Sequence, residues 1–166
     1  MKKLLALLLA LSMIFCFAAC GEGDNQQPEV KGEQQSWGQI SVFVPEGYVL
    51  NGGSITGVDD DDPTQCAIQP ETTSMYDYFW IIAKDEATVL MDIETTKSMN
   101  DAKDITVDAG GNTWTGCHYV YEAYSGNIDC GAVYCTVDGV TYLVNFCGHA
   151  PDSPELITVL SSIKAA

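Results

Sequence analysis

The dipeptide Asp138-Gly139 constrains the fold of this chain more than any other local feature. It separates residues 129–137 from residues 140–146, and apolar and β-branched side chains are frequent in both stretches. Asp-Gly favours a two-residue hairpin turn, because both of its positions tolerate a positive φ. The sequence therefore predicts two strands joined by a tight turn, and an antiparallel sheet around them.

The same hairpin determines which cysteines face each other. Counting outward from a two-residue turn, Cys130 lies opposite Cys147 at a non-hydrogen-bonded position, where Cα atoms approach to about 4.5 Å. We therefore expect a disulfide between them. Cys117 and Cys135 become neighbours only if the preceding loop spans residues 124–128, so this pair is the weaker expectation. The cysteine spacings lack the Cys-x-x-Cys pairs of zinc or redox sites, and any unpaired cysteine is interpreted as a small buried apolar residue.

The remaining patterns predict an α+β fold. Acidic residues open a helix over residues 85–99, and Ser153-Pro154 opens a second one over residues 153–163. Strands are predicted over residues 40–44, 66–68, 78–83, 105–107, 113–121, 129–137 and 140–146, with residues 50–63 as a loop. The order β-β-β-α-β-β-β-β-α predicts an antiparallel sheet with flanking helices.

The first twenty residues have the composition of a targeting segment. Lys2 and Lys3 precede an apolar run over residues 4–19, shorter than the about 20 residues of a spanning helix, and the run ends at Cys20. This segment resembles a bacterial lipoprotein signal, with Phe17 in place of the usual leucine. The resemblance implies removal of residues 1–19, lipidation of Cys20, and anchoring on the outer face of the cytoplasmic membrane. An uncleaved helix or plain secretion is the alternative.

Composition divides the rest of the chain into a linker and one domain. Residues 20–35 comprise the lipidated cysteine and a polar, acidic stretch that we expect to be a flexible linker, and residues 36–166 are the domain. After removal of the leader, five lysines face 23 acidic residues, and the chain has no arginine. Such a surface repels nucleic acid, which we exclude as a partner. We expect a monomer.

Four segments of the domain carry a family resemblance. They are Ile-Ser-Val-Phe-Val-Pro-Glu-Gly-Tyr at residues 40–48, Gly-Asn-Thr-Trp at 111–114, Asp-Gly-Val-Thr-Tyr at 138–142 and Leu-Ser-Ser-Ile-Lys at 160–164. Together with the order of elements, they make the domain look like a member of the PsbP/Mog1 superfamily. The resemblance implies an α/β/α sandwich and a binding or accessory role, and it transfers no active-site residue to this chain.

An acidic run supplies the only metal-ligand pattern. Asp60, Asp62 and Glu71 occupy positions one, three and twelve of an EF-hand-like count, but position six is Gln65 rather than glycine, and the loop would run into a strand. A solvated acidic loop is the favoured interpretation, and we predict neither a metal site nor a bound cofactor.

Catalytic motifs are absent from the sequence. His118 and His149 are the only histidines, and Cys147 with His149 is a conceivable catalytic pair, although no orienting acid is evident. We interpret both histidines as ordinary strand or surface residues. The chain also has no Gly-x-Ser-x-Gly, no His-Glu-x-x-His and no glycine-rich phosphate loop.

Aromatic residues are dense in two of the predicted strands. They are Tyr76, Tyr78, Phe79 and Trp80, together with Tyr119, Tyr121 and Tyr124. These side chains are predicted to be core or cross-strand pairs, with a ligand groove as the alternative.

These patterns together favour a non-catalytic, membrane-anchored lipoprotein outside the cell whose domain binds a protein or an envelope component. The second hypothesis is a lipoprotein that binds a small ligand or calcium. A hydrolase that uses His118 or His149 is the third.

Overall fold

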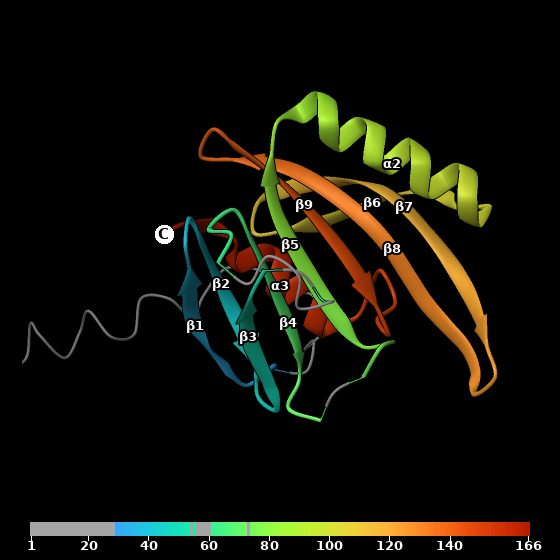
Figure 1. The fold of residues 1–166 in the computed structure, drawn as a ribbon, viewed down its shortest axis with the longest axis horizontal. Coiled ribbons are helices and arrows are strands. Elements are labelled where there is room, and N and C mark those ends of the chain that lie inside the picture. The colour runs from blue at the N-terminus through green and yellow to red at the C-terminus, as the bar shows by residue number, and fades with distance from the viewer. Residues whose placement is uncertain (1–28, 54, 56–60, 73) are drawn as a thin grey trace, which may run out of the picture.

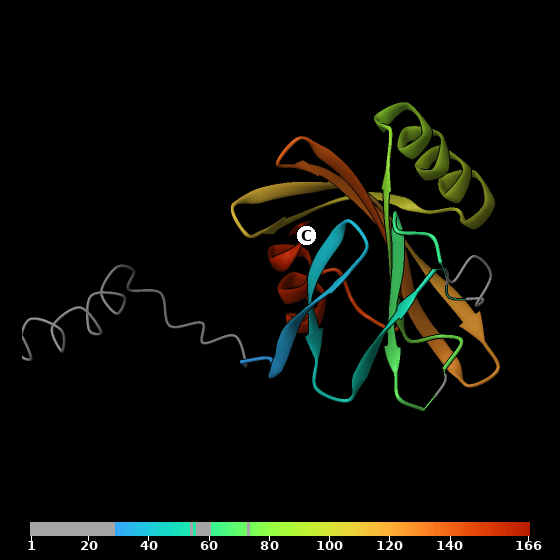
Figure 2. The ribbon, with the colours of Figure 1, turned by 60° about the vertical axis from the view of Figure 1, so that its left-hand side comes forward.

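A computed structural model describes residues 29–53, 55, 61–72 and 74–166, and these residues form two antiparallel sheets and two helices (Figures 1 and 2). The large sheet has the strand order β3 (Tyr48–Gly52), β4 (Gln65–Pro70), β5 (Tyr78–Lys84), β9 (Val140–Cys147), β8 (Gly126–Val137), β7 (Asn112–Ala123), β6 (Lys103–Ala109). The small sheet has the order β1 (Gly32–Trp37), β2 (Ile40–Pro45), β10 (Lys164–Ala165). The helices are α2 (Glu86–Asn100) and α3 (Pro154–Ser162).

The elements form layers on both faces of the large sheet. Helix α2 covers part of one face, where Val89 and Ile93 pack on buried residues of β5 and β9. Helix α3 and the small sheet cover the opposite face and enclose the larger core, which contains Phe79, Trp114 and Tyr142. The predicted α+β class with an antiparallel sheet is confirmed. No helix among the described residues is long and apolar enough to cross a membrane.

Local signals placed the main hairpin and both helices correctly. Asp138 and Gly139 have φ values of 52° and 83°, and Val137 pairs with Val140, as the predicted two-residue turn requires. Asp85 caps α2 by accepting a hydrogen bond from the Thr88 backbone N–H. Ser153 caps α3 in the same way.

The linker was predicted too long, because Gly32–Gln35 belong to strand β1. This polar segment pairs through its backbone with the buried strand β2, and the Gln34 amide donates to the Ser41 hydroxyl over 2.9 Å. An edge strand of this kind needs few apolar side chains, since the ladder and its neighbour hold it in place. The predicted linker and domain boundary at residue 35 is therefore wrong by a few residues.

Three short strands are missing from the predicted order. Besides β1, they are β3, which takes up the beginning of the predicted loop 50–63, and the two-residue β10. Strand β3 alternates half-buried and exposed residues along Tyr48–Gly52, and its pairing with β4 holds it in the sheet. Strands this short depend on their neighbours rather than on their own sequence pattern.

Candidate binding surface

The face of the large sheet that carries α2 is only partly covered by it. The helix packs over Ile82, Leu143 and Ala132. In the next cross-strand row, the register places Tyr78, Cys147, Cys130 and Tyr119 side by side on β5, β9, β8 and β7. Since side chains alternate between faces along a strand, this row lies on the same face as the residues under α2.

The side chains beyond α2 form one aromatic surface. We call Tyr76, Tyr78, Tyr119 and Tyr121, which surround the Cys130–Cys147 disulfide, the tyrosine surface. The rings of Tyr76 and Tyr121 stack with centroids 5.6 Å apart and an interplanar angle of 22°, and the two residues are 40% and 43% exposed. Burial raises the pKa of Tyr78 and Tyr119, so their phenols are neutral at physiological pH.

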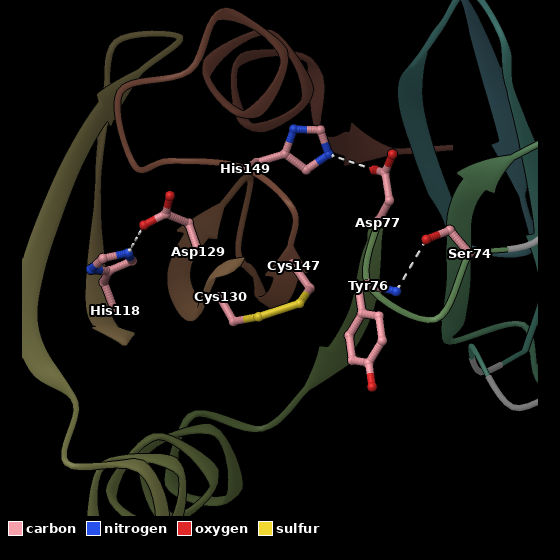
Figure 3. Close-up of a disulfide and its surroundings, with 8 residues drawn as sticks. All are labelled: Ser74, Tyr76, Asp77, His118, Asp129, Cys130, Cys147 and His149. Carbon is pink, nitrogen blue, oxygen red and sulfur yellow. Dashed lines mark hydrogen bonds and ion pairs between the residues drawn. A yellow bond between two sulfur atoms is a disulfide. The ribbon is translucent and has the colours of Figure 1, made fainter. Parts of the chain in front are cut away.

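The predicted disulfide lies in the middle of this surface. Cys130 and Cys147 are directly opposed in the ladder, with Cα atoms 4.1 Å apart, and their sulfur atoms are bonded (Figure 3). The count from the hairpin turn therefore identified the pair correctly. The cross-link joins β8 to β9, the two strands that lie between Tyr78 on β5 and Tyr119 on β7.

The structure does not bring Cys117 and Cys135 together. Strands β7 and β8 are joined by the two-residue turn Tyr124-Ser125, so Cys117 lies opposite Ala132 and Cys135 lies opposite Tyr142 on β9. The weaker disulfide expectation is wrong because it assumed a longer loop. Cys117 is buried under α2, whereas Cys135 packs against the core on the other face.

Of the two arrangements expected for these aromatic residues, full burial in the core holds for Phe79, whereas Tyr76 and Tyr121 form a stacked pair. Phe79 is fully buried, but Tyr76, Tyr121 and Tyr124 are exposed, and Tyr78, Trp80 and Tyr119 are half-buried. The period-two spacing of Tyr119 and Tyr121 places both on one face of the sheet. The sequence does not reveal that α2 covers only part of this face and leaves Tyr121 exposed.

A polar cleft occupies the opposite face at the same end of the sheet. Its volume is about 550 Å³, and Asp77, His149 and Tyr48 form its wall. One oxygen of Asp77 accepts hydrogen bonds from the Tyr48 hydroxyl at 2.8 Å and from His149 Nε2 at 3.0 Å. Asp77 therefore turns toward His149, while the ring of the adjacent Tyr76 points to the opposite side of the chain (Figure 3).

Packing holds His149 in this cleft. The ring is 7% exposed and stacks on Phe79 with centroids 4.2 Å apart. Burial lowers the pKa of His149, and the Asp77 carboxylate only partly opposes this effect. Burial and the hydrogen bond to Asp77 raise the pKa of Tyr48. The neighbouring Gly148 has φ +85°, and a Cβ there would lie 2.6 Å from the Tyr76 carbonyl oxygen, so the close approach of these segments requires glycine.

Among the described residues, the side-chain hydrogen bonds of the two histidines go to acidic residues and not to a nucleophile. The Cys147 sulfur is in the disulfide on the opposite face, so the conceivable Cys147–His149 pair does not form. The described residues lining the His149 cleft include no serine, threonine or cysteine. His118 pairs with Asp129 over 2.7 Å between β7 and β8. Each histidine has an acidic neighbour that the sequence did not reveal, because these pairs form across strands.

The EF-hand-like count does not correspond to one ligand loop. Asp60 lies outside the described residues, and so does Cys20. The Asp62 carboxylate accepts hydrogen bonds from the Thr64 backbone N–H, the Thr64 hydroxyl and the Gln65 amide. Strand β4 separates Asp62 from Glu71, so the two carboxylates do not share a loop. Among the described residues, no cluster of three metal-ligating side chains is present.

The comparisons with known proteins establish only the fold. No protein family's sequence profile matches the chain, and no curated protein does. The chain is similar to a crystal structure from Bacteroides thetaiotaomicron VPI-5482 at 1.50 Å resolution, with a TM-score of 0.53 and 14% sequence identity over 81% of this chain. The similar region makes up 48% of that protein, so this chain corresponds to about half of its length.

Proposed function

We propose that this protein is a bacterial lipoprotein, anchored through Cys20 on the outer face of the cytoplasmic membrane, whose single domain binds a protein partner without catalysis. The tyrosine surface is the binding face. The observation that carries the proposal is the stacked, exposed pair Tyr76–Tyr121 on the part of the sheet that α2 leaves uncovered.

Charge distribution supports this choice of face. The chain has a formal net charge of −16, yet the side chains of the tyrosine surface and the adjacent Trp80 and Asn145 are uncharged. Protein interfaces are depleted in charge at their centre and enriched in tyrosine and tryptophan. Tyrosine also supplies a large, rigid contact area at low entropic cost.

Anchoring is supported by the sequence and by the disulfide. The basic start, the apolar run and the small residues before Cys20 favour lipidation. The Cys130–Cys147 bond is of the kind that persists outside the reducing cytosol. The PsbP/Mog1 resemblance adds a binding or accessory role, and the arrangement of helices on both faces of an antiparallel sheet is compatible with it.

The anchor is tested by metabolic labelling with an alkyne-bearing fatty acid. The wild-type chain is expected to carry the label in the membrane fraction, and Cys20→Ser is expected to remain unlabelled. Cys16→Ser is the matched control, because Cys16 lies within the predicted leader and should not affect labelling. Equal labelling of the Cys20→Ser chain would contradict lipidation at this residue.

The binding face is tested by photo-cross-linking on intact cells. A benzophenone-bearing phenylalanine at Tyr121 is expected to give a discrete protein adduct, identifiable by mass spectrometry. The same probe at Ser161, exposed on α3, is the control and should give none. Loss of the Tyr121 adduct when Tyr76→Ala is added would support the tyrosine surface. Adducts of equal yield from both positions would contradict it.

Binding of a small ligand is a second candidate, and the His149 cleft favours it. The cleft has the volume of a small-molecule site and contains a buried imidazole and a phenol that are positioned by one carboxylate. Amide chemical shifts of Gly148 and Glu46 in a metabolite screen test it. Shifts confined to the cleft would support this second function, and an unchanged spectrum would exclude it for the compounds screened.

A further inference from the structure

Strand β7 continues well beyond its neighbour β6. The pairing of the two strands ends at Lys103 and His118, whereas β7 continues to Ala123. On its other side, β7 pairs with β8 all the way to the turn. Among the described residues, the stretch of β7 from Tyr119 to Ala123 thus has one edge without a partner strand, on a hairpin that projects from the molecule (Figure 1).

The register shows which backbone groups this edge presents. Ala123 and Gly126 flank the two-residue turn and form a hydrogen-bonded pair, so Tyr121 and Tyr119 also exchange their backbone hydrogen bonds with β8. The alternate residues are Val120 and Glu122. Their N–H and C=O groups point away from β8, into the space that β6 would occupy if it were longer.

This edge differs from the edge that β6 forms farther along the sheet. Strand β6 carries Lys103, Asp104 and Asp108, and charged side chains of this kind protect an edge from pairing with other chains. In the unpaired stretch of β7, Glu122 is the only charged residue, and Val120 is 49% exposed. The β7 edge therefore lacks most of the protection found on β6.

The free edge is continuous with the tyrosine surface. Tyr119 and Tyr121 lie on the strand itself, and Tyr76 stacks on Tyr121 from the neighbouring loop. A strand that paired with Val120 and Glu122 would place every second side chain next to these rings, because side chains alternate between the faces of a sheet. Backbone pairing and apolar contact would then come from one bound segment.

We propose that the partner binds as an extended peptide segment that adds to β7 next to residues 119–123, with apolar side chains at alternate positions and basic residues among the others. This inference rests on the proposed function and names the form of the partner. Basic residues at the other positions would lie on the face of Glu122, and they suit the acidic chain. A second copy of the chain is disfavoured as the occupant, since each copy carries 23 acidic residues and only five lysines once the leader is removed.

The test measures binding of synthetic peptides to the full acylated chain in detergent. The probes are a set of eight-residue peptides in which valine, isoleucine or tyrosine alternates with lysine or threonine. At least one is expected to bind. Its counterpart, N-methylated at the residues whose N–H would face β7, is expected to bind at least about tenfold more weakly, because two hydrogen bonds are lost while the side chains stay the same.

A matched pair of variants tests the same edge from the protein side. Val120→Pro removes an N–H that faces outward and leaves the ladder with β8 intact, a position at which strands tolerate proline. It is expected to weaken peptide binding at least about tenfold. Val120→Thr keeps the N–H and is expected to bind the peptide at least about tenfold more tightly than Val120→Pro does. Thermal unfolding shows whether both variants remain folded. If Val120→Pro does not fold, the comparison between the peptide and its N-methylated counterpart decides the outcome.

Several outcomes would overturn the inference. They are the absence of binding by any peptide, equal binding of the N-methylated peptide, a concentration-dependent dimer in sedimentation that Val120→Pro abolishes, and binding of neutral oligosaccharides to the tyrosines in place of peptides. If no peptide binds while the Tyr121 cross-link to a protein persists on cells, the proposed function stands and only strand addition fails.

Discussion

The tyrosine surface and the His149 cleft are made by the same short segments, on opposite faces of one sheet. Tyr76 belongs to the tyrosine surface and the next residue, Asp77, to the cleft (Figure 3). Likewise, Cys147 lies in the tyrosine surface and His149 in the cleft. In the cleft, the polar groups bond to one another, since Asp77 accepts from both Tyr48 and His149. On the tyrosine surface, two stacked rings are left about 40% exposed.

This difference separates a part that stabilises the fold from a part that is available to a partner. Buried polar groups that bond to each other are costly to disrupt, whereas exposed aromatic rings contribute little to the stability of the fold. Variants of the cleft should therefore act mainly on stability. Variants of the tyrosine surface should act mainly on binding.

The largest expected effect on stability comes from the disulfide, which cross-links the adjacent strands β8 and β9. Cys130→Ser together with Cys147→Ser should lower the free energy of unfolding by about 3 kcal/mol, since a cross-link that closes a loop of this length restricts the unfolded chain by about that much. Denaturant unfolding with and without reductant measures it. Cys135→Ser is the control, because Cys135 is a free thiol. A loss below about 1 kcal/mol would show that the ladder alone holds the strands.

Removal of the shared carboxylate in the cleft should have the next largest effect. Asp77→Ala leaves the Tyr48 hydroxyl and the buried His149 without their common acceptor, so we expect a loss of about 2 kcal/mol. Chemical unfolding measures this loss, and Asp152→Ala, at an exposed position, provides the comparison. A result equal to that of Asp152→Ala would mean that the cleft bonds add nothing to stability.

His149 should make the stability of the domain depend on pH. Burial lowers the pKa of this residue in the folded protein below the ordinary value of 6.5. As the pH falls through 6.5, the His149 side chain takes up a proton in the unfolded state before it does so in the folded state, so the free energy of unfolding decreases. His149→Phe removes this contribution. Between pH 7.5 and pH 5, the free energy of unfolding of the wild type should therefore fall relative to that of the variant. A constant difference would contradict the assignment.

The smallest effect on stability is expected from the tyrosine surface. Tyr121→Ala and Tyr76→Ala each remove a ring that is more than a third exposed, so each should cost about 1 kcal/mol or less. With the cross-linking probe at residue 121, Tyr76→Ala should also reduce the yield of the partner adduct severalfold, as truncations of interface tyrosines do. A cost as large as that of Asp77→Ala would place these tyrosines among the residues that hold the fold together.

Much of the fold follows from local sequence signals. Asp138-Gly139 predicted the hairpin and the Cys130–Cys147 pair, and the caps at Asp85 and Ser153 predicted both helices. These features depend on residues close in the chain or on a register counted from one turn. The strands β1, β3 and β10 were missed because neighbouring strands, rather than their own patterns, hold them in place.

The candidate sites were less predictable, because they depend on contacts between distant segments. Asp77 and His149 are 72 residues apart, and no local pattern connects them. The exposed tyrosines have the same spacing as buried ones, and what distinguishes them is how far α2 extends over the sheet. Likewise, the free edge of β7 arises only because β6 begins at Lys103.

The most direct test of the central claim compares the two faces in one experiment on intact cells. The cross-linking probe at Tyr121 is combined in turn with Tyr78→Ala on the tyrosine surface and with Tyr48→Phe in the cleft. We predict that Tyr78→Ala abolishes the protein adduct and that Tyr48→Phe leaves its yield unchanged. Retention of the adduct in Tyr78→Ala with its loss in Tyr48→Phe would contradict the account and would assign partner binding to the cleft.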